Sequence, residues 1–260
     1  MRSATSILVL AVLVVLSVLS SSCGGDGSGE LTVSAASSLT DAFEELAEGF
    51  EADHPGTEVL LNFDSSAALA DQIDAGAPVD VFASADAANV AQVAASGRTY
   101  GEPVAFATND LVIVTRPGNE YEVAGPGDLA RLVAGGEVIA LCAESAPCGR
   151  LADELLAGSE RGGSGAAGPD ESGVTRAPNA RATLGAVVRG DAAAAVVYRT
   201  DALAAGDSVE LVEVAGSPVS TEYLAVTLER GAGDPDLSNA FVEMLTSREG
   251  QAVLASGGFR

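Results

Sequence analysis

Three stretches of the sequence decide the fold: L-T-V-S-A-A-S-S-L-T-D-A-F (31–43), N-F-D-S-S-A-A-L-A-D-Q-I (62–73) and A-G-A-P-V-D-V-F-A-S-A-D (75–86). In the first stretch, an apolar run is followed by hydroxyl residues and then by apolar residues at helical spacing. This pattern predicts a strand followed by a helix that begins near Ser38. The second stretch predicts a similar junction near Ser66. The alternation of strands and helices is typical of an α/β fold with a mostly parallel sheet.

Both junctions place serines where a helix begins, and such positions bind anions. The first turn of a helix has unpaired N–H groups and a partial positive charge, and hydroxyl side chains add further donors. Serine is also a preferred N-cap, so capping alone explains either Ser38 or Ser66 when it is considered singly. An oxyanion site therefore needs support from other parts of the chain.

That support comes from three segments further along: A-P-C-G (146–149), N-A-R-A-T-L (179–184) and A-V-V-Y-R-T-D-A (195–202). Together with the two serine junctions, and in the same order, they resemble motifs of the periplasmic molybdate-binding proteins of ABC transporters, a family of type II solute-binding proteins. The resemblance extends from Leu31 to the C-terminal G-G-F. It implies an α/β fold of two lobes with the ligand cleft between them.

The resemblance also implies a set of oxyanion ligands. Ser38 and Ser66 match ligand serines, and Tyr198 matches a ligand tyrosine. Cys148 and Ala180 match positions that donate a backbone N–H group. Ala180 replaces the usual valine of the family, but a backbone donor does not depend on its own side chain.

Several neighbouring residues leave alternatives open. Ser37 is an additional hydroxyl beside Ser38, so either serine is a candidate to face the ligand. The position of Tyr198 at a strand end is equally explained by a tyrosine that covers the edge of the core. We interpret Arg181 as steadying a helix start or a contact between lobes. Three aspartates are interpreted as helix caps or domain-crossing residues rather than acid and base groups: Asp80, Asp86 and Asp201.

By resemblance, residues 31–107 and 203–260 form the first lobe and residues 108–202 form the second, with crossings near Thr108 and Asp201. Residues 157–173 are rich in glycine and serine, which predicts a flexible surface loop. A phosphate-binding glycine loop is disfavoured because no Gly-Lys-Ser/Thr sequence follows it.

The chain begins with an export signal. Residues 7–19 are almost entirely apolar, Arg2 precedes them, and Cys23 follows a group of small residues. We predict that residues 1–23 are a lipoprotein signal segment ending at the lipid-anchor cysteine Cys23, and that residues 24–30 are a flexible tether. A plain secretory signal is the alternative. Both interpretations place the protein on the extracytoplasmic side. In the first of them, membrane contact is limited to the lipid anchor.

Cys142 and Cys148 lie six positions apart. In an exported protein this spacing predicts a disulfide, with a pair of free thiols as the alternative. The chain has a single histidine, His54, and it lies far from the cysteines in sequence. We therefore predict no metal site.

The composition limits the partners. The net charge is −24, from 37 acidic residues and 13 arginines, which argues against binding to nucleic acid or to anionic membranes. An anion site remains compatible with this charge, because surface charges are screened beyond about 8–10 Å while hydrogen-bond donors act at contact.

The resemblance carried by the five ordered motifs implies a monomeric solute-binding protein that captures molybdate and tungstate, requires no cofactor, and delivers its ligand to the permease of an ABC importer. Other cargoes remain open: sulfate, phosphate or a small organic anion. An exported serine hydrolase using Ser38 or Ser66 is a further alternative, but the chain has one histidine and no G-x-S-x-G motif. We therefore predict that the protein is not an enzyme.

Overall fold

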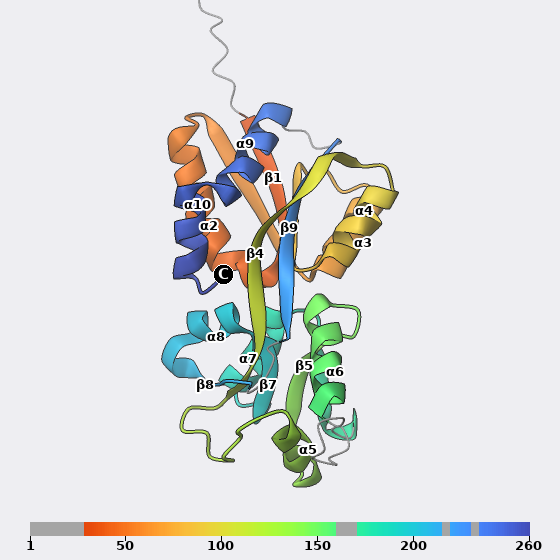
Figure 1. Cartoon of the computed structure of the whole chain (residues 1–260), viewed down its shortest axis with the longest axis vertical. Coiled ribbons are helices and arrows are strands. Elements are labelled where there is room, and N and C mark those ends of the chain that lie inside the picture. The colour runs from red at the N-terminus through yellow and green to blue at the C-terminus, as the bar shows by residue number, and fades with distance from the viewer. Residues whose placement is uncertain (1–28, 160–170, 215–218, 230–233) are drawn as a thin grey trace, which may run out of the picture.

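The computed structural model describes residues 29–159, 171–214, 219–229 and 234–260. The predicted signal segment, Cys23 and nearly all of the tether lie outside these ranges, as does most of the predicted loop 157–173. The described chain forms two halves, one above the other in Figure 1, connected by strands β4 (Thr99–Thr115) and β9 (Ser220–Leu228). Within the described ranges, no helix combines the length and the apolar character that crossing a membrane requires.

The first half contains a five-stranded part of the sheet in the order β2-β1-β3-β9-β4. Strand β1 (Gly29–Ala36) pairs in parallel with β2 (Thr57–Asp64) and β3 (Val81–Ser84), while β9 runs antiparallel to β3 and β4. Five helices accompany these strands: α2 (Thr40–Asp53), α3 (Ser66–Asp74), α4 (Ala87–Ala95), α9 (Pro235–Thr246) and α10 (Arg248–Ser256).

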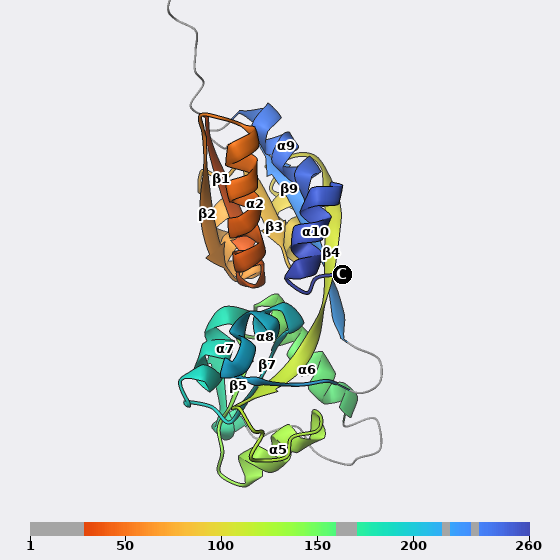
Figure 2. The same ribbon diagram turned by 90° about the vertical axis from the view of Figure 1, so that its left-hand side faces the viewer.

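Alternation along the strands divides the first half into two apolar layers. Val81 belongs to the core cluster that includes α2 and α9, whereas its neighbour Phe82 belongs to the cluster with α3 and α4. Successive side chains of a strand point to opposite faces of the sheet. The helices therefore cover both faces, with α2 and α10 visible in front of the strands in Figure 2.

The second half is built on the C-terminal part of β4. This segment pairs antiparallel with β7 (Ala194–Tyr198) and β8 (Glu210–Val212), while β5 (Ile139–Cys142) runs parallel to β7 and to β6 (Val174–Ala177). The helices of this half are α5 (Gly127–Ala134), α6 (Pro147–Ser159), α7 (Ala180–Val188) and α8 (Arg199–Ala205).

The predicted two-lobed α/β class is confirmed, but the sheet is mixed rather than mostly parallel. Both long strands, β4 and β9, run antiparallel to their partners. The first part of β4 was not predicted, because Gly101 and Pro103 interrupt its alternation and the pairing with β9 shifts register there.

The predicted lobe limits remain a prediction, but the position of β8 suggests one change. We expected the chain to leave the second lobe near Asp201. Strand β8 instead pairs with Ile113–Thr115 of β4, and α8 also lies in the lower half (Figure 1). We therefore propose that the second crossing follows β8.

Candidate functional site

The five residues implied as oxyanion ligands line one pocket between the two halves. The pocket encloses a small cavity of about 10 Å³. That volume is far below the roughly 300–1,000 Å³ of sites for drug-sized molecules, so a small ion suits the pocket better than a larger molecule. Its lining residues are Ala36, Ser37, Ser38, Asp64, Ser65, Ser66, Ala85, Pro147, Cys148, Asn179, Ala180 and Tyr198.

Four of the five implied ligands lie where a helix begins. Ser38 lies in the 3-10 turn Ser37–Leu39 (η1) between β1 and α2, Ser66 and Ala180 are the first residues of α3 and α7, and Cys148 lies in the first turn of α6. Tyr198 is the last residue of β7. Helix starts carry N–H groups without intrahelical partners, so several of them converge on one small space.

The serine of the second junction that caps its helix is Ser65, not Ser66. The Ser65 Oγ accepts a hydrogen bond from Ala68 N at 3.2 Å. Ser66 Oγ instead accepts from Ala85 N at 2.9 Å. Since an oxygen that accepts this bond retains its own proton, the Ser66 hydroxyl can donate to a ligand in the pocket.

Ser38 does not act as a helix cap either. Its Oγ lies 2.7 Å from the hydroxyl of Tyr223, a residue of β9 185 positions away in the sequence. Sequence reasoning missed Tyr223, because no motif surrounds it and only the fold brings it to the site. Ser37 also lines the pocket, so the choice between Ser37 and Ser38 as the ligand serine stays open.

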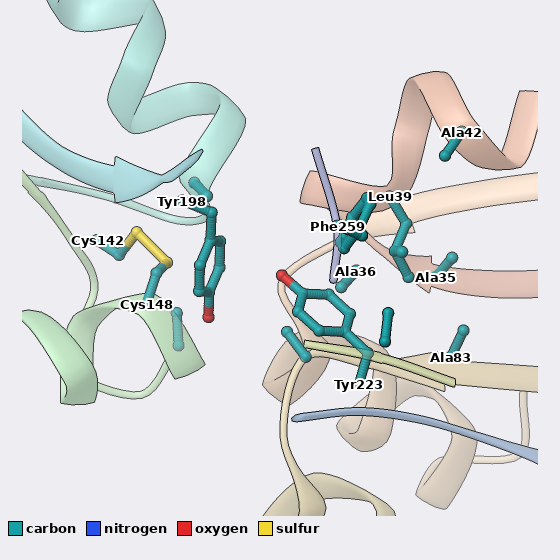
Figure 3. Packing of buried hydrophobic residues seen from close by; sticks show 14 of the residues in the cluster. Ala35, Ala36, Leu39, Ala42, Ala83, Cys142, Cys148, Tyr198, Tyr223 and Phe259 are labelled. Atoms are coloured by element: carbon teal, nitrogen blue, oxygen red, sulfur yellow. A yellow bond between two sulfur atoms is a disulfide. The ribbon is translucent and has the colours of Figure 1, made fainter. Parts of the chain in front are cut away.

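Tyr198 contributes a buried hydroxyl that has no hydrogen-bond partner among the residues that the structure describes. In Figure 3 its ring extends from the end of β7 beside the disulfide. Burial raises the pKa of Tyr198 well above its ordinary value, so the hydroxyl is neutral and can donate. Buried polar groups without a partner are rare in proteins, and this one lines a pocket built from other donors.

The predicted disulfide between Cys142 and Cys148 is present. It joins the end of β5 to the first turn of α6, directly beside the pocket (Figure 3). The next residue, Gly149, lies against the backbone of Ala143. A Cβ atom at position 149 would overlap the carbonyl oxygen of Ala143, so only glycine fits there. The backbone at Cys148 is therefore held on both sides.

Among the described residues, three polar contacts with acidic side chains bridge the two halves around the pocket. Each joins a side chain at the start of α6 or α7 to an acidic residue of the first half. The contacts are Asn179 Nδ2 to Asp64 Oδ1 at 3.0 Å, Arg181 Nη2 to Asp41 Oδ2 at 2.9 Å, and the ion pair of Arg150 with Asp86. The structure thus has its halves in contact, and Arg181 makes the lobe contact that we proposed as one of its roles.

The three aspartates that we interpreted as caps or crossing residues have different environments. Asp86 caps α4 by accepting from Asn89 N, as interpreted, whereas Asp80 accepts from Thr32 N beside a strand. Asp201 is buried in α8, 3.9 Å from the Arg181 Nε. Burial raises the pKa of Asp201 to about 7, although the positive charge of Arg181 opposes this shift.

Among the residues that the structure describes, no arginine or histidine lines the pocket. Within the described ranges, no group of three or more His, Cys, Asp or Glu residues is arranged to hold a metal ion. His54 accordingly lies elsewhere, with its Nδ1 against the carbonyl oxygen of Phe50. The pocket is thus suited to bind a small anion through neutral O–H and N–H donors, and Asp64 is the one acidic residue in the described part of its lining.

Comparisons with known proteins agree with this arrangement. The family described as bacterial extracellular solute-binding protein matches residues 31–260. The chain is 34% identical over 233 residues to the molybdate-binding protein ModA of Mycobacterium tuberculosis, covering 90% of this chain and 85% of the relative.

Two solved structures share the fold at lower sequence identity. The sulfate-binding protein SubI of Mycobacterium tuberculosis H37Rv aligns with a TM-score of 0.76 at 18% identity, covering 89% of this chain and 86% of that one. The periplasmic molybdate-binding protein of Azotobacter vinelandii aligns with a TM-score of 0.67 at 20% identity, covering 88% and 98%.

Proposed function

The chain belongs to the bacterial extracellular solute-binding protein family, and we propose that within this family it captures molybdate in the pocket between its halves. The relative from Mycobacterium tuberculosis that is 34% identical to this chain is named a molybdate-binding protein, which supports the choice of ion. The solute-binding class is not enzymatic, in accord with a pocket of neutral donors without an assembled acid and base pair.

The Tyr198 hydroxyl is the single observation that carries the proposal. It is buried, it lines the pocket, and its proton has no acceptor in the described residues. Leaving a buried hydroxyl unpaired costs about 1–3 kcal/mol, so its retention is best explained by an acceptor that arrives with the ligand. An oxyanion provides such an acceptor, and charge-assisted hydrogen bonds to it are short and strong.

The remaining ligands follow from the geometry of the pocket. The hydroxyls of Ser38 and Ser66 would donate from the first half, and the backbone N–H groups of Cys148 and Ala180 would donate from the second. A five-atom ion at the limit of about −1.5 kcal/mol per heavy atom binds with roughly −7.5 kcal/mol, which corresponds to micromolar affinity. Tighter binding would come from the charge of the ion in a dry, preorganised site.

Isothermal calorimetry tests the proposal directly. Molybdate, tungstate, sulfate and phosphate are titrated separately into the purified protein at physiological salt. We expect micromolar or tighter binding of molybdate and tungstate, and none of phosphate. Silence for molybdate from a folded sample would mean that the pocket serves another ligand.

Sulfate is the second candidate, because the neutral donors that line the pocket would serve any tetrahedral dianion. The alignment with a sulfate-binding protein, at 18% identity, concerns the fold rather than the ligand. Sulfate and molybdate carry the same charge and shape but differ in size. If calorimetry showed tighter binding of sulfate than of molybdate, we would conclude that sulfate is the transported ion.

Membership of the family also supports a proposal for the transport partner and the cellular location of the protein. The protein would release its ion to the permease of an ABC importer, act as a monomer, and remain on the extracytoplasmic face through lipid on Cys23. Metabolic labelling with a fatty acid, compared between the natural chain and Cys23→Ala, tests the anchor. An unlabelled natural chain would favour the secretory alternative.

A further inference from the structure

The Tyr223 side chain lies behind the pocket rather than in its lining. It is fully buried on β9, opposite Ala107 of β4. Three aromatic rings surround it, with centroids 5.2 Å away at Phe259, 6.0 Å at Tyr198 and 6.2 Å at Phe106. Figure 3 shows the hydroxyl of Tyr223 at the end of its ring that faces the other half. Because the ring is held on several sides, its hydroxyl has a fixed position.

The direction of the hydrogen bonds at Tyr223 follows from Asn109. The Oδ1 of Asn109 accepts from Asp110 N at 3.0 Å, which orients the amide group. Its Nδ2 then donates to the Tyr223 hydroxyl at 3.3 Å and to Thr200 Oγ1 at 2.9 Å. An amide nitrogen has no acceptor capacity, so the Tyr223 oxygen accepts from Asn109.

The proton of Tyr223 then needs an acceptor of its own. Among the hydrogen bonds of the described residues, the one available to it leads to Ser38 Oγ at 2.7 Å. Burial raises the pKa of Tyr223 above its ordinary value, so the phenol keeps this proton. Once Ser38 Oγ accepts from Tyr223, the proton of Ser38 can turn toward the pocket.

We propose that Tyr223 is a positioning residue, oriented by Asn109, that fixes the Ser38 hydroxyl as a hydrogen-bond donor to the bound oxyanion. The proposal rests on the proposed function of the pocket. Without the donation from Asn109, the Tyr223 oxygen could accept from Ser38, and the Ser38 hydroxyl would then present its lone pairs to the ion. A fixed donor favours a fully deprotonated ion, whereas a protonated ion such as hydrogen phosphate needs an acceptor.

A double-mutant cycle separates this role from general packing. Tyr223→Phe removes one oxygen and retains the ring. We expect it to weaken molybdate binding by about 3- to 30-fold in calorimetry, part of the effect of losing a hydrogen bond to a charged group. In a Ser38→Ala background, the same substitution should change the affinity less than about twofold, since independent sites add and residues acting through one another do not.

Matched variants keep the test informative. Tyr121→Phe removes a tyrosine hydroxyl that contacts Arg116 outside the pocket and should leave binding unchanged. Asn109→Ala removes the orienting donor without altering the aromatic ring, and its effect should likewise disappear in Ser38→Ala. It serves as the second route if Tyr223→Phe does not fold.

Selectivity provides a readout that a packing defect would not change. In Asn109→Ala the Tyr223 oxygen is free to accept the proton of Ser38, so the Ser38 oxygen can accept from a ligand. This variant should therefore show measurable binding of hydrogen phosphate, which we expect the natural protein not to bind. Equal weakening of molybdate in the natural and Ser38→Ala backgrounds, or no weakening in either, would overturn the inference. If the natural protein binds none of the four ions, the proposed function itself fails, which is a different result.

Discussion

At the residue scale, the Tyr198 hydroxyl predicts a conflict between stability and binding. Tyr198→Phe removes a buried hydroxyl that has no partner within the described ranges. Unfolding of the ligand-free variant by urea should therefore require about 1 kcal/mol more than the natural protein. Molybdate binding should weaken about tenfold or more, because a hydrogen bond to a charged group contributes about 1.5–3 kcal/mol. A variant that loses stability without losing affinity would contradict the ligand role of Tyr198.

Asp201 predicts a pH dependence with a definite sign. Its pKa in the folded protein is about 7, compared with an ordinary value of 3.8. Below pH 4 the group is protonated in both folded and unfolded chains and costs nothing. Between pH 4 and 7 the unfolded chain ionises first, so this group lowers the free energy of unfolding as the pH rises. Above pH 7 the cost is complete.

Asp201→Asn tests that sign, because the amide resembles the protonated carboxyl. The free energy of unfolding of the variant, minus that of the natural protein, should increase between pH 4 and 7 and then stay level. An increase on the order of a few kcal/mol follows from about 1.4 kcal/mol per unit of pKa shift. Urea unfolding at pH 4.5, 6 and 8 provides the measurement. A difference that is flat across these values would mean that Arg181 keeps the carboxylate charged at low cost.

At the element scale, the start of α6 offers a clean pair of glycine substitutions. Gly149→Ala would drive a Cβ into the Ala143 carbonyl oxygen and displace the backbone beside Cys148. It should destabilise the protein by about 1–3 kcal/mol and weaken molybdate binding. A Cβ atom at Gly158, in the last turn of the same helix, meets no atom of the described residues within 4 Å, so Gly158→Ala should stabilise the protein by up to about 0.5 kcal/mol. If Gly149→Ala and Gly158→Ala changed the melting temperature and the molybdate affinity equally, the close contact of Gly149 with Ala143 would not be needed for stability or binding.

Helices and strands were predicted best where a short stretch of sequence, such as an apolar run or a serine at a helix start, was enough to define them. The apolar runs 31–36 and 59–63 predict two strands, and the residues after Ser66 predict a helix. The strands β1 and β2 lie within about two residues of these limits, and α3 begins at Ser66. The apolar run Leu111–Thr115 likewise predicts a strand. It forms the second half of β4, where all five residues are buried. Strand β6 was missed, since the four residues Val174–Ala177 are only partly buried and carry no alternation.

The residues of the candidate site also fall into two groups, those that lie in sequence motifs and one that does not. Its helix-start residues belong to ordered motifs, so resemblance brought Ser38, Ser66 and Cys148 into one hypothesis, and the structure brings them to one pocket. Their roles as ligands stay predictions. Tyr223 could not be predicted, because its contact with Ser38 depends on how β9 lies in the sheet rather than on neighbouring sequence.

At the scale of the whole molecule, the net charge of the chain is −24. This negative charge repels the anion that we propose binds between the halves. The bridging contacts of Arg150 and Arg181 place positive charge at this boundary without entering the pocket lining. Their arrangement predicts that local ion pairs, rather than the overall field, govern how long a bound ion stays.

Asp41→Asn tests this prediction, because it removes the partner of Arg181 while leaving Arg181 beside Asp201. An exposed ion pair contributes about 0.2–1 kcal/mol, so ion release in stopped-flow measurements should accelerate by about 1.4- to 5-fold. Glu48→Gln removes the same charge two turns further along α2, at an exposed position.

The two variants distinguish opposing effects of the same charge change. If the overall negative field dominated, removing either acidic group would slow ion release and tighten binding. If the contact with Arg181 dominates, Asp41→Asn accelerates release and Glu48→Gln leaves it nearly unchanged. The acceleration should also fade toward 1 M salt, where screening acts over about 3 Å. Slower release from Asp41→Asn would therefore reject the bridging role of Arg181, because repulsion would then outweigh the ion pair.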